Sequence, residues 1–538
     1  MKKIKNNISR YFVGVATSVA ILLGSCDTTE LDLTVSPNTL SPESADPNFI
    51  LNQMQIDLNR LFEGVRDEAT TTMRLANMFG AYQSNIENTT FNAFAPPSDD
   101  NVWTRAYRIN GNRLLLESLA EANPDIVQQK SIGGLITAYT FTLFVDIFGD
   151  IPFSEANDRD ILNPSADDQV AIYEEMFLLI DESISALQGE TSRVISNDLF
   201  YANGGLTNWI KFGNTLKLKM YNQISSIDAT RATTGINALI AGGNLMETAS
   251  DDFQFSYTTD SAPAESRHPY FTENYLPGGA AIYMSNDLMR RMRDSDDPRL
   301  RYYFYRQSLT DPSGDDLPCT TTLAQCYIGG FYWGREHTNA QGIPADNLAR
   351  TIYGIYPGGG AFDNDNNTPG TLNTGLNGAG INPILLSSYA KFIQAEAAIT
   401  LGTTGDPRTL LEEGVRNHIA KVMAFGAADA EAAFIPSTAD VDTFVNGVLS
   451  DYDAATTDTE RQTIIIEQYY ITTYGNGIEA FNFYRRTGLP ELEDPIDASP
   501  FPRSFIVPGD EVNVNPNFDF NQLTDQVFWD NNPAGFID

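Results

Sequence analysis

Apolar residues recur at helical spacing along most of the chain. From Phe49 onward they repeat every three or four positions, as the buried face of a helix does. This first set comprises Ile50, Leu51, Met54, Leu58 and Leu61. Further predicted helices cover residues 71–82, 102–122, 131–148, 169–187, 208–224, 285–293, 386–400, 407–425 and 458–474. The pattern therefore predicts a mainly α-helical fold.

One predicted helix, over residues 131–148, is apolar nearly all round, which is typical of a helix buried on most sides. Gly149 and Pro152 follow it, and both residue types end helices, because Gly adopts the left-handed conformation and Pro cannot continue the helical hydrogen bonds. We place this helix at the centre of the helical part of the fold. In the helix over residues 208–224, Asn208 is the expected N-cap.

The connections between these helices are short, which favours hairpins stacked side by side as in tetratricopeptide repeats, although no clean repeat of that period is present. Over residues 251–385, Gly, Pro, Asn and aromatic residues replace the helical pattern. The expected fold is mainly α, with tetratricopeptide-like helical hairpins packed against a loop-rich lobe with few short strands. The helical lobe would comprise residues 49–250 and 386–480, and residues 490–538 would belong to the loop-rich lobe. The Pro- and Asn-rich tail from Pro490 is expected to wrap over the surface.

The N-terminus has the pattern of an export signal. Basic residues up to Arg10 lead into an apolar run over residues 11–23, and Gly24 and Ser25 directly precede a lone cysteine, Cys26. The run is shorter than the roughly 20 apolar residues of a membrane-spanning helix. We therefore favour a signal peptide that ends in a lipobox over a single transmembrane anchor. The segment resembles the bacterial lipoprotein site, where the cysteine is acylated and its acyl chains hold the protein on a membrane.

This interpretation divides the chain into a signal peptide over residues 1–25, a tether over residues 26–48 and a single unit over residues 49–538. The tether is polar, acidic and rich in Pro and Ser, without helical or strand period. We expect it to link the lipid flexibly to the body of the protein.

Charge restricts the possible partners. The chain has 70 acidic and 34 basic residues, and its formal net charge is −36. Such a charge repels the phosphates of nucleic acids and anionic lipids, so nucleic acid binding is not expected. A neutral or cationic ligand fits the composition better.

Two cysteines remain beyond Cys26, namely Cys319 and Cys326, in a Thr-rich segment. Because an exported protein meets oxidising conditions, we favour a local disulfide between them. Two free thiols are the alternative. A metal site is less favoured, since no His or second Cys pair lies nearby in the sequence to complete four ligands.

Motifs for catalysis are absent from the sequence. The three histidines, His268, His337 and His418, are widely separated and do not form a motif such as HExxH, so we expect structural or exposed roles for them. No nucleophile elbow, Walker loop or dinucleotide fingerprint occurs in a strand-to-helix context. The sequence gives no support for an enzyme, and no cofactor is expected.

One loop could hold a cation. Asp363 and Asp365 lie in an Asp- and Asn-rich segment between glycines, and such oxygen ligands on a flexible loop suit calcium. The spacing lacks the final Glu of an EF-hand. A solvated cluster of Asx turns is the commoner explanation of this composition, so calcium is the less favoured of the two.

Aromatic residues in the loop-rich lobe are the candidate ligand contacts. Tyr332 and Trp333 belong to an aromatic cluster just past the cysteine segment, and Tyr82 and Tyr275 lie in two other aromatic loops. Flat rings present apolar faces at low conformational cost and suit stacking on sugars or peptide side chains. The alternative is that the rings fill a small core beneath the loops. Our hypothesis places the ligand on Tyr332 and Trp333, with Tyr82 and Tyr275 as neighbours.

Several segments, taken together, resemble the SusD/RagB family, the surface lipoproteins that cap TonB-dependent outer-membrane transporters of the SusC type. The resemblance covers most of the chain after Cys26, in order. Its segments are YTFTLFVDIFGDIP (residues 139–152), WIKFGNTLKL (209–218), DPR (297–299), SYAKFIQAEAAITLG (388–402), FNFYRRTGLP (481–490) and a closing element with Pro502, Arg503, Pro508, Glu511 and Asn513. We interpret Arg485 and Arg486 as buried pairing partners and C-terminal caps, and Gly488 and Pro490 as a helix stop.

The resemblance implies a lipid-anchored protein on the outer surface of the outer membrane, which captures an oligomeric nutrient and hands it to a SusC-like TonB-dependent transporter. It implies a glycan as the ligand and the helical lobe as the docking face. Ligand contacts in this family come from variable loops, so no binding residue transfers by motif. A peptide ligand is the main alternative, while a surface glycosidase and a purely structural adaptor are the others.

Overall fold

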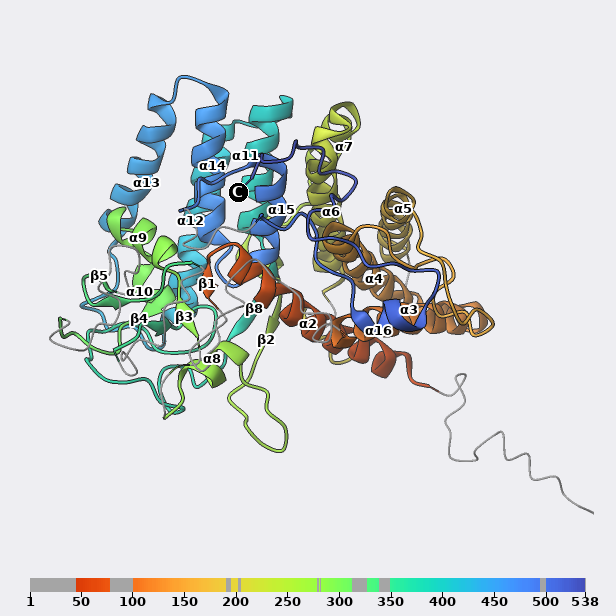
Figure 1. Cartoon of the computed structure of the whole chain (residues 1–538), viewed down its shortest axis with the longest axis horizontal. Helices are drawn as coiled ribbons and strands as arrows, with labels where there is room; N and C mark the ends of the chain where they lie inside the picture. Colours follow the sequence, from red (N-terminus) through yellow and green to blue (C-terminus); the bar gives the residue numbers. More distant parts are fainter. Residues whose placement is uncertain are drawn as a thin grey trace, which may run out of the picture. The chain divides into compact units, whose positions relative to one another are not determined.

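Helices make up most of the part of the chain that the computed structural model describes, namely residues 45–77, 100–189, 195–201, 205–277, 280, 282–311, 327–337, 349–493 and 500–537 (Figure 1). The longer helices are α2 (Pro47–Thr72), α3 (Asp100–Ala122), α4 (Val127–Phe148), α5 (Gln169–Leu187), α6 (Leu206–Gln223), α7 (Ala229–Gly242), α11 (Ser387–Leu401), α12 (Pro407–Gly426), α13 (Thr438–Ala454), α14 (Asp458–Thr472) and α15 (Gly477–Thr487). The shorter helices are α8 (Pro269–Asn274), α9 (Asn286–Asp294), α10 (Leu300–Tyr303) and α16 (Gly509–Val514), with 3₁₀ turns η3 (Pro124–Ile126), η4 (Ile224–Ser226) and η5 (Ala249–Asp251).

The described strands are short and pair two by two, always antiparallel. They are β1 (Ala76–Asn77), β2 (Phe253–Ser256), β3 (Tyr283–Met284), β4 (Phe304–Tyr305), β5 (Tyr327–Gly329), β6 (Tyr332–Trp333), β7 (Ile352–Tyr353) and β8 (Ile381–Leu385). The pairs are β1 with β3, β2 with β8, β4 with β7 and β5 with β6. The predicted fold class, mainly α with few short strands, is confirmed.

Consecutive helices pack against one another, as stacked hairpins do. α11 to α14 stand side by side in Figure 1, and α3, α4 and α5 lie at the other end of the helical part, with α6 and α7 between them. The strands gather with α8, α9 and α10 around the loops that precede β8. Residues 47–538 form one compact unit. The finer division into a helical and a loop-rich lobe stays a prediction.

The apolar helix α4 lies in the core. It would be long and apolar enough to cross a membrane, together with η3, but its most apolar window is entirely buried inside the protein. Gly134 lets the neighbouring helix α5 approach closely, since a Cβ added there would lie 2.4 Å from Oγ of Ser183. Gly149 ends α4, as predicted, with a positive φ of 83° and a ψ of −124°. This conformation favours glycine but is not the left-handed helical one that was expected.

Most predicted helices are present, but two local expectations are wrong. The helix expected over residues 71–82 does not begin there, because α2 runs to Thr72 and the chain then forms β1. Residues 78–82 lie outside the described part. Asn208 is not the N-cap of α6, which begins at Leu206 after Gly205; its amide instead donates a hydrogen bond of 2.7 Å to the carbonyl of Ser250. The apolar pattern thus located α6 but not its first residue, and over the described residues 73–77 it predicted a helix where the chain leaves α2 and forms β1.

The tail lies only partly on the surface, where the sequence predicts a segment that wraps over it: Val514 is 73% exposed, but other tail residues are part of the core. Trp529 is fully buried and its indole N–H donates a 2.9 Å hydrogen bond to the Asp146 carboxyl on α4. Asp530 forms a buried ion pair with Arg503, 2.6 Å from that residue's Nε. Burial raises the pKa of Asp146 to about 6, against the opposing effect of the Lys219 charge, the Trp529 hydrogen bond and the Arg485 charge. The tail therefore closes the helical core.

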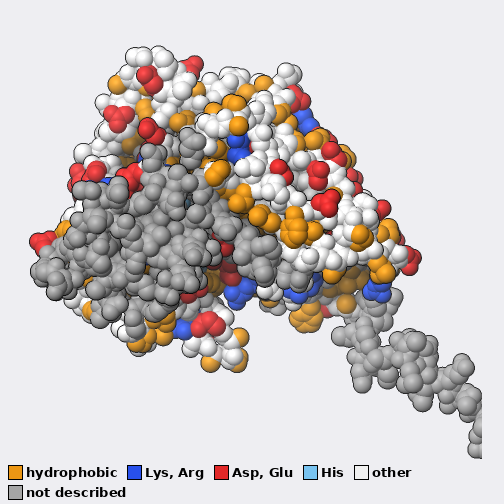
Figure 2. All heavy atoms as spheres, viewed as in Figure 1, with side chains coloured by type: hydrophobic (Ala, Val, Ile, Leu, Met, Phe, Trp, Pro, Cys, Tyr) orange, Lys and Arg blue, Asp and Glu red, His pale blue; other side chains and the backbone are white. Residues whose placement is uncertain are grey.

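Acidic side chains are spread over the described part of the surface shown in Figure 2 and exceed basic ones there, as the composition leads one to expect. Many basic side chains are used in ion pairs with acidic ones. The excess acidic charge therefore remains on the surface.

Candidate functional site

Tyr332 and Trp333, the first two candidate ligand contacts, lie in strand β6 and are 4% and 3% exposed. The Arg306 guanidinium lies 5.1 Å from the centre of the Tyr332 ring. The backbone N–H of Trp333 donates a 2.9 Å hydrogen bond to the Thr351 hydroxyl, and its ring centre lies 5.1 Å from that of Tyr327. In this conformation both rings contribute to the local core.

Tyr275 is fully buried at the end of α8. Its hydroxyl donates to the carbonyl of Tyr353 and accepts from the N–H of Ala361, both at 2.7 Å, and its ring stacks on Phe271. These bonds hold the loop before β8 against α8. Burial thus favours the alternative in which the rings fill a core beneath the loops, and the ligand contacts stay a prediction.

Four other predicted residues lie outside the described part of the chain, so the structure says nothing of their roles. They are Tyr82, the candidate ligand contact; Cys26, the candidate lipidation site; and Cys319 and Cys326, the candidate disulfide. These stay predictions.

The two candidate calcium ligands are engaged with arginines. The Asp363 carboxylate is buried and lies 2.6 Å from Nε of Arg306, and Asp365 lies 2.9 Å from a terminal nitrogen of Arg301 and also contacts Arg306. The two guanidinium groups lower the pKa of Asp365, against the opposing effect of burial. In the described ranges, no group of three His, Cys, Asp or Glu side chains is arranged to hold a metal ion. Cationic side chains occupy the place that calcium would take, and the calcium prediction is untested.

All three histidines lie in the described part of the chain. His337 is half-buried, and burial lowers its pKa to about 3. The other two are fully buried. His268 is buried, with Nε2 3.1 Å from the side-chain oxygen of Asn382, and His418 is buried with Nδ1 3.3 Å from the guanidinium of Arg299. Burial, reinforced by the neighbouring arginines Arg66 and Arg299, lowers the pKa of both imidazoles well below the usual value. Both rings are therefore neutral near pH 7.

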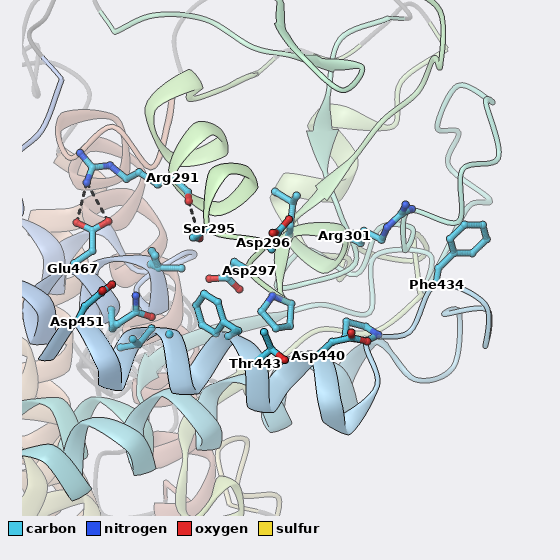
Figure 3. Close-up of a pocket in the computed structure, with 18 residues that line it drawn as sticks. Arg291, Ser295, Asp296, Asp297, Arg301, Phe434, Asp440, Thr443, Asp451 and Glu467 are labelled. Atoms are coloured by element: carbon cyan, nitrogen blue, oxygen red, sulfur yellow. Dashed lines mark hydrogen bonds and ion pairs between the residues drawn. The ribbon is translucent and has the colours of Figure 1, made fainter. Parts of the chain in front are cut away.

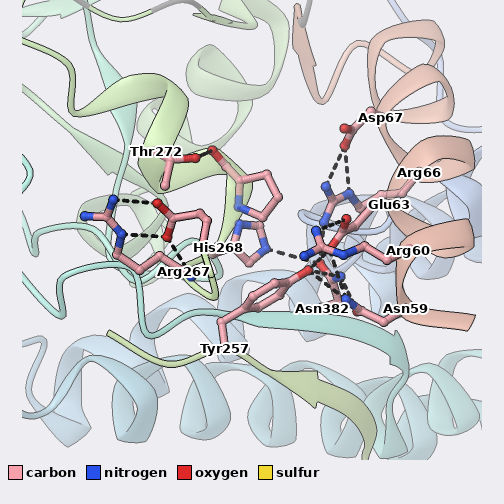
Figure 4. Close-up of polar contacts among 12 residues, drawn as sticks. Asn59, Arg60, Glu63, Arg66, Asp67, Tyr257, Arg267, His268, Thr272 and Asn382 are labelled. Atoms are coloured by element: carbon pink, nitrogen blue, oxygen red, sulfur yellow. Dashed lines mark hydrogen bonds and ion pairs between the residues drawn. The ribbon is translucent and has the colours of Figure 1, made fainter. Parts of the chain in front are cut away.

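A buried polar network joins α2 to β8, to the residues next to β2 and to α8 (Figure 4). Arg66 on α2 donates to the side chain of Asn382 on β8, and its guanidinium lies 4.3 Å from the centre of the Tyr270 ring. Asn382 in turn donates to the hydroxyl of Tyr257 at 2.7 Å, which donates to Glu63 on α2. The network fixes the β2–β8 ribbon and α8 on α2. It is a rigid support for the loops rather than an open site.

An open groove of about 830 Å³ lies between α13 and the α9–α10 segment (Figure 3). One face of α13 lines it, through residues spaced three and four apart. They are Asp440, Thr443, Phe444, Gly447, Val448 and Asp451. Asp296 and Pro298 of the α9–α10 segment also line the groove, and so does Ile471 of α14, which is buried and counts with Phe444 and Val448 as its apolar floor.

Acidic side chains dominate the groove. Asp296, Asp440 and Asp451 are exposed at its rim. The two arginines that reach it are already paired, Arg291 with Glu467 at 2.8 Å and Arg301 with Asp365. The groove therefore carries a net negative charge over an apolar floor. Sequence reasoning missed the groove because α13 was not among the predicted helices. The signal for this helix was present, since its apolar positions repeat every three or four residues: Val441, Phe444, Val445, Val448, Leu449 and Tyr452.

Comparison with known proteins identifies the family. A family model described as "Starch-binding associating with outer membrane" matches residues 37–507. The chain belongs to this SusD-like family. The predicted family is thereby confirmed. A search of curated proteins finds no match.

Solved structures share the SusD-like fold over almost their whole length. A chitin-binding protein is 22% identical, with 90% of this chain and 100% of that chain covered and a TM-score of 0.67. A chitin-binding SusD homologue from Flavobacterium johnsoniae is 20% identical, with 90% and 99% covered and a TM-score of 0.66. A SusD homologue from Bacteroides fragilis is 19% identical, with 90% and 99% covered and a TM-score of 0.68. At these identities the likeness establishes the fold alone.

In this SusD-like protein the residues that carried the resemblance support the fold. Arg485 is fully buried and donates to the carbonyls of Asp146 and Arg503 at 2.6 and 2.7 Å. Burial lowers the pKa of Arg485 to about 9, so it stays charged at pH 7. The Arg486 guanidinium donates two hydrogen bonds to the Glu396 carboxylate of α11, which makes a bidentate ion pair. Arg486 is thus confirmed as a buried pairing partner, whereas Arg485 is buried and binds carbonyl groups, including that of Asp146 near the end of α4.

Proposed function

We propose that the protein is a lipid-anchored outer-membrane protein that binds an oligomeric nutrient, a glycan, and passes it to a SusC-like TonB-dependent transporter. The observation that carries this proposal is the family match over residues 37–507, with its description as starch-binding and associated with the outer membrane. Two of the solved relatives are chitin-binding proteins, which favours a glycan. A peptide is the second candidate ligand.

Binding without a chemical step is the simplest mechanism for this role. Hydrogen bonds from polar side chains and stacking on rings hold a sugar, and no bond of the ligand is broken. We retain the aromatic loops as the place where the glycan binds. The indole N–H of Trp333 is a buried donor without a hydrogen-bond partner among the residues described. A ligand hydroxyl that reached it on a small movement of the loops would satisfy that donor.

Replacing Trp333 with Ala is expected to weaken glycan binding by up to a few kcal/mol, because the ring and its N–H are lost together. The measurement is isothermal titration calorimetry of the protein without its signal peptide, using starch- and chitin-derived oligosaccharides. Trp333→Phe is the matched variant that keeps a ring but lacks the donor. If Trp333→Ala bound the oligosaccharide with unchanged affinity, Trp333 would not be a ligand contact, although the protein would still bind a glycan. No binding of any oligosaccharide would count against the function itself, and product formation would favour an enzyme.

Replacing Cys26 with Ala is expected to release the protein from the membrane fraction, because the thiol that carries the acyl chains is lost. The full chain is expressed in a bacterium that processes lipoproteins. Incorporation of a labelled fatty acid measures acylation, and immunoblotting of the membrane and soluble fractions measures release. Thr28→Ala, two residues beyond the site, is the control and should stay on the membrane. If Cys26→Ala remained fully membrane-bound, the anchor would have to lie elsewhere.

A further inference from the structure

We propose that the groove between α13 and the α9–α10 segment is a second binding site, which takes an extended basic peptide. This site is distinct from the aromatic loops assigned to the glycan. The argument uses the shape of the groove, its charge and one glycine in its wall (Figure 3).

The wall of the groove is a single face of α13. Asp440 and Asp451 stand at the two ends of this face, and Phe444 and Val448 lie between them and are 7% and 8% exposed. Eleven helical positions correspond to about 16 Å, the length that about five residues of an extended peptide span. The groove therefore offers an apolar strip with a carboxylate at each end.

The carboxylates at the rim are available to a ligand. Asp296 and Asp451 are exposed, and no side-chain hydrogen bond or ion pair engages either of them within the described part of the chain. Asp440 accepts hydrogen bonds only from Ser437 at the start of its own helix, where they lower the pKa of the carboxyl. The arginines of the groove are neutralised by their own partners. Charge complementarity thus selects lysine or arginine side chains.

Gly447 keeps the middle of the groove open. It lies inside α13, where Gly costs about 1 kcal/mol relative to Ala. A Cβ added at Gly447 would meet no atom within 4 Å, so no close approach of another element requires a glycine here. The missing side chain instead leaves the backbone of α13 open to whatever lies in the groove.

The same features favour a peptide over a sugar. A stacked sugar needs the face of an aromatic ring, but Phe444 is almost fully buried and the guanidinium of Arg301 lies 4.9 Å from the centre of the Phe434 ring. Val448 and Ile471 are 8% and 2% exposed, so the apolar lining offers small edges that aliphatic side chains can contact, but no ring face for a sugar. In an extended segment, alternate side chains point to opposite sides, so apolar residues would face the floor while basic ones reach the rim.

The test uses a short fluorescein-labelled peptide that alternates lysine with leucine, and fluorescence anisotropy with the whole exported chain. We expect binding at low salt that weakens at physiological salt. Gly447→Leu should abolish it, because the new side chain fills the groove; Leu is also a better helix former than Gly, so the variant should fold. The double variant Asp296→Asn with Asp451→Asn should weaken binding about fivefold or more.

Two matched variants act as controls. Gly242→Leu adds the same side chain at another helical glycine with open space around it, and Glu121→Gln removes an exposed acidic charge from α3. Both should bind the peptide as the parent protein does. Equal loss in Gly242→Leu and Gly447→Leu, or unchanged binding in Gly447→Leu, would overturn the proposal.

Further ligands test the assigned chemistry. A peptide that alternates glutamate with leucine should not bind, and one that alternates lysine with serine should bind more weakly than the lysine–leucine peptide. If the lysine–serine peptide or an oligomer of glucosamine bound equally well, charge alone would explain the affinity and the peptide assignment would fail.

Discussion

Replacing Trp529 with Ala is expected to lower the free energy of unfolding by about 3–5 kcal/mol, the range typical of large aromatic residues removed from a core. Trp529 is fully buried, and its indole ring lies 4.6 Å from the Arg485 guanidinium. The change would leave a cavity and would also remove one donor to the Asp146 carboxyl. Urea denaturation monitored by circular dichroism measures the effect as a shift in the urea concentration at the unfolding midpoint.

A second aromatic residue of the same tail provides the control. Phe520 is 45% exposed, so Phe520→Ala should change the free energy of unfolding by about 1 kcal/mol or less. The comparison separates a tail that completes the core from one that only covers the surface. Similar small effects for Trp529→Ala and Phe520→Ala would support the original expectation of a surface tail.

The tail shows where the hydrophobic pattern stops being informative. Helical spacing identified most long helices, because a helix must repeat its apolar face every three or four residues to bury it. The tail has no such period, because an irregular segment buries residues without a regular spacing. Phe505 and Val507 lie in a stretch, residues 501–509, that is buried at nearly every position, and Trp529 is buried farther along the tail. Composition alone suggested a surface segment, and long-range packing decided otherwise.

The candidate sites were only partly predictable for a related reason. A cluster such as Tyr332 and Trp333 indicates that rings gather locally, but it does not say whether the neighbouring loops cover them. The groove was missed because it depends on α13, whose exposed face is rich in Thr, Asp and Gly. The residues that form this face of α13 do recur at helical spacing in the sequence. They are Asp440, Phe444, Val448 and Asp451, at spacings of four, four and three. Only the placement of the α9–α10 segment opposite turns that face into a groove.

The motifs of the family resemblance behaved differently, because they encode contacts between distant parts of the chain. Glu396 in α11 and Arg486 in α15 belong to two separate motifs, and the structure joins them in a buried ion pair with N–O distances of 2.5 and 2.8 Å. Asp297 and Arg299 of a third motif form another pair, and both side chains are fully buried. Such residues indicate the family without indicating its ligand.

Replacing Glu396 with Gln should lower the free energy of unfolding at pH 7 by about 3–5 kcal/mol, because the Arg486 charge would be left buried without its counter-ion. The Arg486 side chain is only 6% exposed, and Glu396 also accepts hydrogen bonds from Asn222 and Gln462 at 3.0 and 3.2 Å. Urea denaturation again measures the effect. Glu412→Gln is the control: this residue pairs with Arg416 one helical turn away on the surface, and its loss should cost at most about 0.5 kcal/mol.

The pH dependence of this pair gives the more specific test. Burial alone would raise the pKa of Glu396, but the Arg486 charge and the hydrogen bonds outweigh it, so the pKa of the folded state lies below the usual 4.5. The unfolded chain therefore binds a proton at a higher pH than the folded chain does, and the stabilisation is complete above about pH 4.5. It is lost as the pH falls through the pKa of the folded state. The stability difference between the parent protein and Glu396→Gln should accordingly be constant from neutral pH to about pH 5 and shrink below pH 4.5. A difference that instead grew on acidification would show that Glu396 is protonated in the folded protein, and would rule out the ion pair as the link between α11 and α15.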